Sequence, residues 1–338
     1  MRSSIEALRM EMASQVLFYR QGQKTLTGPE GLLMPMRGKR VLVTGATGLI
    51  GGAVVAALKG FGGIKVLEAD SAWHIGEALK ANADYVIHAA GYAQPAKFTA
   101  NALDTIDVNT NWTLKLAKAL PKNGRMIFLS SSEVYNGSPH QRHGIDDIGR
   151  TTPAHLRAPY IEAKRCGEAI VHAARAMDKA VVAARVSLAY GPGVKKGDSR
   201  VISQFITQAL QTQQIRLQDG GTARRTYCYV TDIAEMILRI LMVGREPVYN
   251  VGGQSDVTII GLARKIGAMT GAEVKLPYLN RTVTGPAGAP QHVTLDMGRT
   301  KQEFSKFDFV PIDDGLARTI AWHRALEGME ATAPAEPG

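Results

Sequence analysis

Three side chains in the middle of the chain have the types and spacing of a proton-transfer site. Tyr160 and Lys164 stand four residues apart, which places them one turn apart on the same face of a helix. Ser131 lies upstream, just after the apolar run 126–129. An unperturbed tyrosine has a pKa of about 10, so Tyr160 acts as a base near neutrality only where positive charge stabilises its phenolate. Lys164 supplies such a charge, and the spacing predicts a tyrosine base with a lysine partner.

Residues 41–51 indicate a dinucleotide site. An apolar strand pattern breaks into glycines and continues as an apolar helix. Gly45 permits a tight turn, Gly48 lets the backbone approach a pyrophosphate, and Gly51 lets the helix pack closely. The helix N-terminus attracts the phosphates. Because strand, turn and helix are all present, this run predicts a bound dinucleotide, whose positively charged nicotinamide ring adds to the field at Tyr160.

The segments that position these residues alternate between strand and helix patterns. The predicted strands are 40–44, 64–68, 85–88, 125–130 and 181–186, and the helices between them are 49–59, 74–81, 101–120 and 160–177. This alternation requires parallel strands with right-handed crossovers, an α/β fold with a Rossmann-like doubly wound sheet. Ligands of such sheets lie at the carboxyl ends of the strands, where Ser131 and the glycine turn are found.

Beyond residue 190 the predicted strands are shorter, and strands and helices no longer alternate regularly. The predicted helices there are 200–211, 233–242, 258–269 and 311–326, and the strands are 215–217, 226–229 and 247–250. We therefore divide the chain into an N-terminal extension, an NAD-binding Rossmann domain, a mainly substrate-binding domain and a disordered tail rich in Ala, Pro and Glu. The boundaries are 1–38, 39–190, 191–326 and 327–338. The apolar spacing between residues 5 and 18 predicts a helix in the extension.

Composition narrows the class of protein. The 338 residues are 45% hydrophobic, enough for a substantial core, but hold no apolar run that approaches the length of a membrane span. The sequence has only two cysteines, Cys166 and Cys228, which are too few for a disulfide framework and too far apart for a CxxC metal motif. The formal charge of +10 is scattered without interleaved aromatics, which favours a small anionic substrate over nucleic acid. We predict a cytoplasmic protein with no membrane partner.

Taken together, these motifs resemble the extended short-chain dehydrogenase/reductase superfamily, in particular its nucleotide-sugar epimerase/dehydratase/decarboxylase family. Tyr160 with Lys164, the glycine turn and Asn109 carry the likeness. The other matching runs are 85–90, 131–135, 185, 190–193, 225–232 and 248–253. The resemblance covers about residues 39–326. It implies a Rossmann-like domain with NAD as cofactor and a smaller mixed domain that holds a nucleotide sugar.

The resemblance also implies a role for individual residues. Tyr160 would take the proton from the sugar C4 hydroxyl as the C4 hydride passes to NAD. Ser131 would hold that hydroxyl, and Lys164 would bind the nicotinamide ribose. The implied catalytic residues are Ser131, Ser132, Glu133, Tyr160 and Lys164. The implied cofactor-binding residues are Gly45, Thr47, Gly48, Leu49, Ile50, Gly51, Asp70, Ala89, Ala90, Tyr160 and Lys164. Arg185 and Arg225 would bind substrate, Arg225 as a bidentate clamp on the nucleotide diphosphate.

The reaction that follows C4 oxidation depends on the triplet 131–133. Ser-Ser-Glu resembles the Thr-Ser-Glu of UDP-glucuronate decarboxylases more than the Thr-Asp-Glu of 4,6-dehydratases, because an acid that protonates a leaving C6 hydroxyl is absent. Glu133 would then manage the proton at C5. We favour decarboxylation of a UDP-hexuronate, with 4-epimerisation and 4,6-dehydration as alternatives. A dehydrogenase that exchanges soluble NAD and a non-catalytic nucleotide-sugar binding protein also stay open.

Two departures from the family pattern concern cofactor and substrate. The family has two strands between the glycine turn and His88, and this chain has room for one, so the sheet is one strand-helix unit shorter than usual. Asp70 is spaced either to bind the adenosine ribose, which favours NAD over NADP, or to end the following strand and meet the adenine. Leu188 replaces an asparagine usual near the diphosphate. Relatives pair through the helices matching 101–120 and 160–177, which implies a homodimer.

Overall fold

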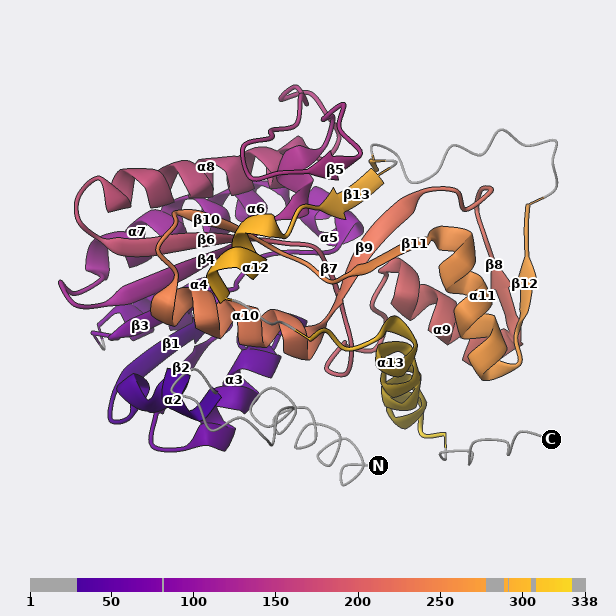
Figure 1. Cartoon of the computed structure of the whole chain (residues 1–338), viewed down its shortest axis with the longest axis horizontal. Helices are drawn as coiled ribbons and strands as arrows, with labels where there is room; N and C mark the ends of the chain where they lie inside the picture. Colours follow the sequence, from indigo (N-terminus) through magenta and orange to yellow (C-terminus); the bar gives the residue numbers. More distant parts are fainter. Residues whose placement is uncertain (1–28, 81, 278–288, 291, 305–307, 330–338) are drawn as a thin grey trace.

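A computed structural model describes residues 29–80, 82–277, 289–290, 292–304 and 308–329. The helix predicted in the N-terminal extension and most of the predicted tail lie outside these residues. Figure 1 shows a large sheet covered by helices and a smaller lobe built around α9, α11 and α13. No helix among the described residues is long and apolar enough to cross a membrane.

The large sheet is parallel and contains six strands within the described part of the chain, in the order β10-β6-β4-β3-β1-β2. Its strands are β1 (Arg40–Thr44), β2 (Lys65–Ala69), β3 (Tyr85–His88), β4 (Arg125–Ser131), β6 (Ala180–Val186) and β10 (Val248–Val251). The predicted doubly wound sheet is confirmed. It takes its last strand, β10, from within the region 191–326.

Helices cover both faces of this sheet because the side chains of each strand alternate between the faces. Val41 and Val43 pack in one apolar cluster with α3 and α10, whereas Leu42 between them packs in another. The helices of this lobe are α3 (Leu49–Phe61), α4 (Ala72–Leu79), α5 (Pro95–Ala100), α6 (Ala102–Asn109), α7 (Asn111–Ala119), α8 (Ala158–Arg175), α10 (Val230–Val243) and α12 (Gly298–Phe304). Ahead of β1, α2 (Pro29–Leu33) and the 3-10 helix η1 (Met34–Met36) bury Leu33 and Met36 in the first cluster.

The predicted helix 101–120 is broken into α6 and α7 at Thr110, whose φ of −114° and ψ of −72° depart from helical values. Side chains around the break bond to carbonyls one turn back: Asn109 to Thr105 at 2.7 Å and Thr110 to Ile106 at 2.8 Å. Such local bonds compete with regular helix geometry and bend the chain. Apolar periodicity continues through the break, so the pattern did not reveal it.

The smaller lobe contains shorter, mixed sheets. One has the order β11-β9-β13-β5 with β7 beside β9, and the other pairs β12 with β8. Its strands are β5 (Arg142–His143), β7 (Leu188–Tyr190), β8 (Gln214–Arg216), β9 (Arg224–Tyr229), β11 (Ser255–Thr258), β12 (Glu273–Lys275) and β13 (His292–Leu295). Its helices are α9 (Val201–Thr212), α11 (Ile259–Thr270) and α13 (Ile312–Glu327). The sequence pattern missed β5, β7, β11, β12 and β13, which are too short to show a period.

Candidate active site

The glycine turn joins β1 to α3 at the carboxyl edge of the large sheet. Gly45 has a φ of +67°, and a side chain there would meet the Ala89 carbonyl oxygen at 2.6 Å and the Ala90 nitrogen at 2.8 Å. A side chain at Gly51 would lie 2.1 Å from the Gly45 carbonyl oxygen. Only glycine therefore fits these two positions. The turn lies directly against Ala89 and Ala90 at the end of β3.

The start of α3 presents backbone N–H groups to a ligand. Gly48 is the N-cap, with extended backbone angles, and no side chain of the described residues caps the helix there. Leu49 and Ile50 follow in the first turn, where N–H groups have no partner within a helix. These donors and the helix dipole attract an anion. The geometry matches the predicted pyrophosphate site.

Asp70 follows β2, the immediate neighbour of β1, where Thr44 pairs with Ala69. Its Oδ1 accepts a hydrogen bond from the Thr47 backbone N–H at 2.8 Å. Asp70 thus lies beside the glycine turn, at the end of the strand next to β1, and the described sheet has no strand beyond β2. This position favours the ribose-binding assignment of the two left open by the sequence.

Thr47 also receives a contact from the smaller lobe. The Lys195 ammonium donates to Thr47 Oγ1 at 3.1 Å. Lys195 belongs to the loop between β7 and α9. This loop is fixed by a hydrogen bond from the indole N–H of Trp322 to the Val194 carbonyl, at 2.9 Å. A cationic side chain is thus held over the turn where an anionic diphosphate would bind.

His88 ties the ends of β1 and β3 together in one hydrogen-bond chain. The Ala90 N–H donates to Thr44 Oγ1 at 3.1 Å, and Thr44 Oγ1 lies 2.7 Å from His88 Nδ1. His88 Nε2 lies 3.0 Å from the Val108 carbonyl oxygen. The chain is satisfied when Nε2 carries the proton and Thr44 donates to Nδ1. Burial lowers the pKa of His88 to about 4, so the imidazole is neutral at pH 7.

This burial predicts a loss of stability in mild acid. An unfolded histidine has a pKa of about 6.5, so between pH 6.5 and pH 4 the unfolded chain binds a proton that the folded protein does not. Stability therefore falls as the pH falls, and His88 costs about 2 kcal/mol between pH 7 and pH 5. Urea unfolding at the two pH values measures the loss. An NMR titration that shows His88 protonating near pH 6.5 in the folded protein would contradict it.

Tyr160 and Lys164 lie on one face of α8, as predicted, and both are buried. The Tyr160 ring stacks on Phe98 with centroids 4.6 Å apart, and the Lys164 ammonium lies 5.5 Å from the centre of the Tyr160 ring. Lys164 donates to the Leu129 carbonyl on β4 at 2.6 Å. Burial raises the pKa of Tyr160 to about 12, partly opposed by a hydrogen bond from Ser131. Burial also lowers the pKa of Lys164 to about 7.

The end of β4 brings the predicted serines and glutamate to this tyrosine. Ser131 is the N-cap of the 3-10 helix η2 (Ser132–Tyr135), and its Oγ accepts from the Glu133 N–H at 3.2 Å. Ser132 is buried at the first position of η2. The Glu133 carboxylate is held in a bidentate ion pair by Arg157, which precedes Tyr160 by three residues. The Arg157 guanidinium lies over the Phe98 ring, 5.1 Å from its centre.

Two further arginines surround this group. Arg225 on β9 is close enough to Glu133 and Arg157 for their charges to act on it, and burial lowers its pKa. Arg200 acts on Tyr160 as a nearby positive charge. Arg200 is itself gripped by the buried Asp198, with Nη2 to Oδ2 at 2.7 Å. The site thus places Tyr160 among three arginines, of which Arg157 and Arg200 are each paired with a carboxylate.

Arg185 occupies a different place from the one predicted. Its guanidinium donates to both oxygens of Glu168, at 3.1 Å or less, and to Tyr135 Oη at 2.8 Å. It also donates to the Ile145 carbonyl at 2.7 Å, and Tyr135 donates on to Asn250 at 2.7 Å. This buried network joins η2, α8, β6 and β10. The arrangement does not favour substrate contact by Arg185 and gives it a structural role behind the site.

Arg157 and Arg200 were not among the predicted site residues. Arg157 carried one local signal, since its position three residues before Tyr160 places it on the same side of α8. Arg200 carried none, because its approach to Tyr160 depends on the loop between β7 and α9 folding back across the sheet edge. The remaining predicted residues gather at one edge of the sheet.

The residues present fit a nicotinamide dinucleotide. The turn at Gly45 is closed to any side chain, the first turn of α3 offers backbone donors, and Asp70 lies where a ribose binds. Lys164 and Tyr160 lie along the same carboxyl edge of the sheet, at the ends of β4 and the start of α8. A dinucleotide bound at the turn therefore extends from Asp70 toward Tyr160.

Comparisons with known proteins agree with this geometry. The chain is 26% identical over 309 residues to UDP-glucuronic acid decarboxylase 1 of Xenopus tropicalis, covering 85% of this chain and 72% of that protein. It is 27% identical over 323 residues to dTDP-glucose 4,6-dehydratase of Streptomyces niveus, covering 84% and 93%.

Solved structures of similar proteins share the fold. Epimerase Mth375 of Methanothermobacter thermautotrophicus matches with a TM-score of 0.76 at 20% identity, over 90% of this chain and 97% of that one. MoeE5 in complex with UDP-glucuronic acid and NAD matches with a TM-score of 0.71 at 23% identity, over 85% and 99%. The model of the NAD dependent epimerase/dehydratase family matches residues 41–252. With its glycine turn, its Tyr160 and Lys164 pair and this match over more than half its length, the chain belongs to the NAD dependent epimerase/dehydratase family, and its cofactor is NAD.

Proposed function

We propose that this protein decarboxylates a UDP-linked hexuronate through a transient 4-keto intermediate. The observation that carries the proposal is the group formed by Glu133, Arg157 and Arg225 beside Tyr160. A hexuronate bears a carboxylate at C6 and a diphosphate at C1, so its negative charge matches a site lined by arginines. The similarity to UDP-glucuronic acid decarboxylases at about 26% identity supports the same class.

The chain's residues divide the chemistry as follows. Tyr160 takes the proton of the C4 hydroxyl. Ser131 is hydrogen-bonded to Tyr160, and Lys164 places positive charge nearby. NAD, when bound, accepts the C4 hydride and later returns it. The 4-keto sugar is a β-keto acid, so its C5–C6 bond breaks, carbon dioxide leaves, and the electron pair becomes the C4–C5 enolate. Glu133, held by Arg157, directs a proton to C5.

The residue types disfavour 4,6-dehydration by this site. That reaction needs an acid that protonates the leaving C6 hydroxyl, and the residue between Ser131 and Glu133 is the buried Ser132. A serine hydroxyl is too weak an acid for this step. A 4-epimerase, for its part, requires no carboxylate near C5, whereas here Glu133 is fixed in place by two donors of Arg157.

The test is to incubate the native protein and NAD with UDP-glucuronate, UDP-glucose and dTDP-glucose in parallel. We expect carbon dioxide and a UDP-pentose from UDP-glucuronate alone, with no net NADH. A 4-keto-6-deoxy product from dTDP-glucose would establish dehydration, and interconversion of UDP-glucose and UDP-galactose would establish epimerisation. Stoichiometric NADH would identify a dehydrogenase, and absence of turnover with every sugar would favour a binding protein.

Glu133→Gln separates oxidation from the later step. The variant is close in size but lacks the carboxylate that directs a proton to C5, so we expect pentose formation to fall by about 10²–10³. NADH absorbance should then persist after substrate is added, because the enolate left by loss of carbon dioxide is not protonated at C5 and the hydride is not returned to C4. Glu162→Gln is the matched control, since Glu162 is a half-exposed partner of Arg165 and should keep full activity. Unchanged pentose formation in Glu133→Gln would remove Glu133 from the mechanism.

We also propose that the protein is a homodimer that pairs through α6 and α7. Leu103 is 82% exposed, and Ile106 and Leu114 on the same two helices are 40% and 39% exposed. Large apolar side chains gathered on neighbouring helices favour contact with a partner surface. Sedimentation of the native protein should give twice the chain mass, and Leu103→Glu should shift it to the monomer.

A further inference from the structure

The sheet ends unusually early on the side where the adenosine half of the cofactor binds. Within the described residues, β2 pairs with β1 on one side and with no strand on the other. A bound dinucleotide runs from the diphosphate at the glycine turn to the ribose at Asp70, and its base then lies beyond β2. The described sheet has no strand end at that point to form a wall against the base.

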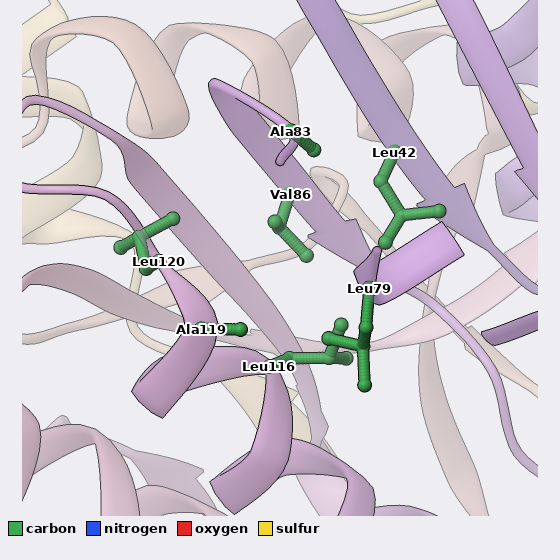
Figure 2. Close-up of a pocket in the computed structure, with 7 residues that line it drawn as sticks. All are labelled: Leu42, Leu79, Ala83, Val86, Leu116, Ala119 and Leu120. Carbon is green, nitrogen blue, oxygen red and sulfur yellow. The ribbon is translucent and has the colours of Figure 1, made fainter. Parts of the chain in front are cut away.

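The helix that follows β2, α4, packs on the sheet through its described side chains. The Ser71 hydroxyl accepts from the His74 N–H at 3.2 Å, and α4 starts at once. Ile75 is 1% exposed, and Leu79 lines the same apolar hollow as Leu42 and Val86 (Figure 2). Ile75 and Leu79 of α4 therefore pack against the sheet.

The hollow beneath α4 offers nothing for a purine to bond. Figure 2 shows that aliphatic side chains from β1, β3, α4 and α7 surround it. The residues that line it are Leu42, Leu79, Ala83, Val86, Leu116, Ala119 and Leu120. A purine base that is specifically recognised needs donors and acceptors placed at its ring edge. This hollow is a packing gap under the shortened connection.

Among the described residues, the polar groups beside the glycine turn are placed for the ribose and the diphosphate. Asp70 is exposed and uses Oδ1 on the Thr47 N–H, which leaves Oδ2 for a ribose hydroxyl. Lys195 reaches Thr47 from the opposite lobe at 3.1 Å and faces the phosphate side. Both groups contact parts of the dinucleotide that do not depend on the identity of the base.

We propose that this protein recognises the ribose–diphosphate–ribose–nicotinamide portion of its cofactor and leaves the adenine exposed to solvent. The site therefore accepts dinucleotides that carry a changed or enlarged purine in place of adenine. A buried base contributes hydrogen bonds of about 1 kcal/mol each, and loss of one changes affinity about fivefold. An exposed base contributes almost nothing to discrimination, since water replaces its partners.

The test uses calorimetric titration of the full-length protein freed of cofactor. It compares NAD, nicotinamide hypoxanthine dinucleotide and nicotinamide 1,N6-ethenoadenine dinucleotide. We expect the three dissociation constants to agree within about threefold. The etheno ring is fluorescent, and iodide should quench it in the complex nearly as well as in solution. A preference for NAD above about thirtyfold, or an etheno ring shielded from iodide, would overturn the proposal. Neither readout depends on the sugar reaction. Failure of this cofactor proposal can therefore be distinguished from failure of the proposed function.

Two variants make the comparison sharper. Asp70→Asn removes the charge that holds the ribose, and we expect all three dinucleotides to bind about tenfold more weakly with their ratios unchanged. Glu68→Gln is the matched control, because Glu68 lies two residues away and pairs with Lys59 at the surface. It should leave all three constants unchanged. If Asp70→Asn weakened NAD but not the hypoxanthine analogue, the base itself would be recognised near Asp70, against the proposal.

Discussion

Tyr160→Phe is expected to lower kcat by about 10²–10⁴ while leaving NAD binding and stability nearly unchanged. The variant removes only the hydroxyl that takes the C4 proton. The ring of Phe retains the stack on Phe98, whose centroid lies 4.6 Å away, so the local packing survives. With a pKa raised to about 12 by burial, Tyr160 needs the positive charges of Lys164 and of bound NAD to work as a base near neutrality.

The measurement is steady-state turnover of UDP-glucuronate, with thermal unfolding and NAD titration on the same preparations. Tyr85→Phe is the matched control and should keep full activity. Tyr85 is the first residue of β3 and so lies at the amino-terminal end of the strands, away from the carboxyl ends that form the site. Ser131→Ala should lie between the two, with a loss of about 10-fold to 10²-fold, since it removes one hydrogen bond to Tyr160. Retention of more than about a tenth of wild-type turnover by Tyr160→Phe would assign the base to another residue.

Lys164→Met is expected to move activity and stability in opposite directions. Activity should fall by about 10²–10³, because the positive charge beside Tyr160 and the donor to the nicotinamide ribose are lost together. The free energy of unfolding should rise by about 2–4 kcal/mol at pH 7, because folding no longer buries an ammonium group. The lost hydrogen bond to the Leu129 carbonyl reduces this gain.

The stability gain should depend on pH with a defined sign. Burial lowers the pKa of Lys164 from 10.5 in the unfolded chain to about 7 in the folded protein. Below pH 7 both states are charged and wild type bears the full cost; as the pH rises toward 10.5 the cost disappears. The advantage of Lys164→Met in urea unfolding should therefore shrink from pH 7 to pH 10. Lys179→Met is the control, since Lys179 also donates to a carbonyl, that of Leu120 at 2.6 Å, but lies only half-buried.

The features that sequence alone determined are those that depend on near neighbours in the chain. Gly45 and Gly51 fit because a strand-to-helix turn forces a positive φ and a close backbone approach within seven residues. Tyr160 and Lys164 share a face because α8 is a regular helix. The alternation of apolar strands and helices likewise requires a parallel sheet whichever order its strands adopt. The fold class followed from these local rules, whereas the family and NAD followed from the resemblance that the motifs carry, and all three are confirmed.

The order of the strands decided the rest, because it sets which distant residues become neighbours. Asp70 lies beside the glycine turn because β2 pairs with β1, and this adjacency also locates the missing unit at the outer edge. Arg185 meets Glu168 because β6 lies beside β4 beneath α8, which places its guanidinium in a buried ion pair. Arg157 holds Glu133 across 24 residues, and Arg200 reaches Tyr160 only because a loop folds back over the sheet edge. Charge pairs of this kind leave no periodic trace in a sequence, since long side chains reach across elements whose relative positions come from packing of the whole core.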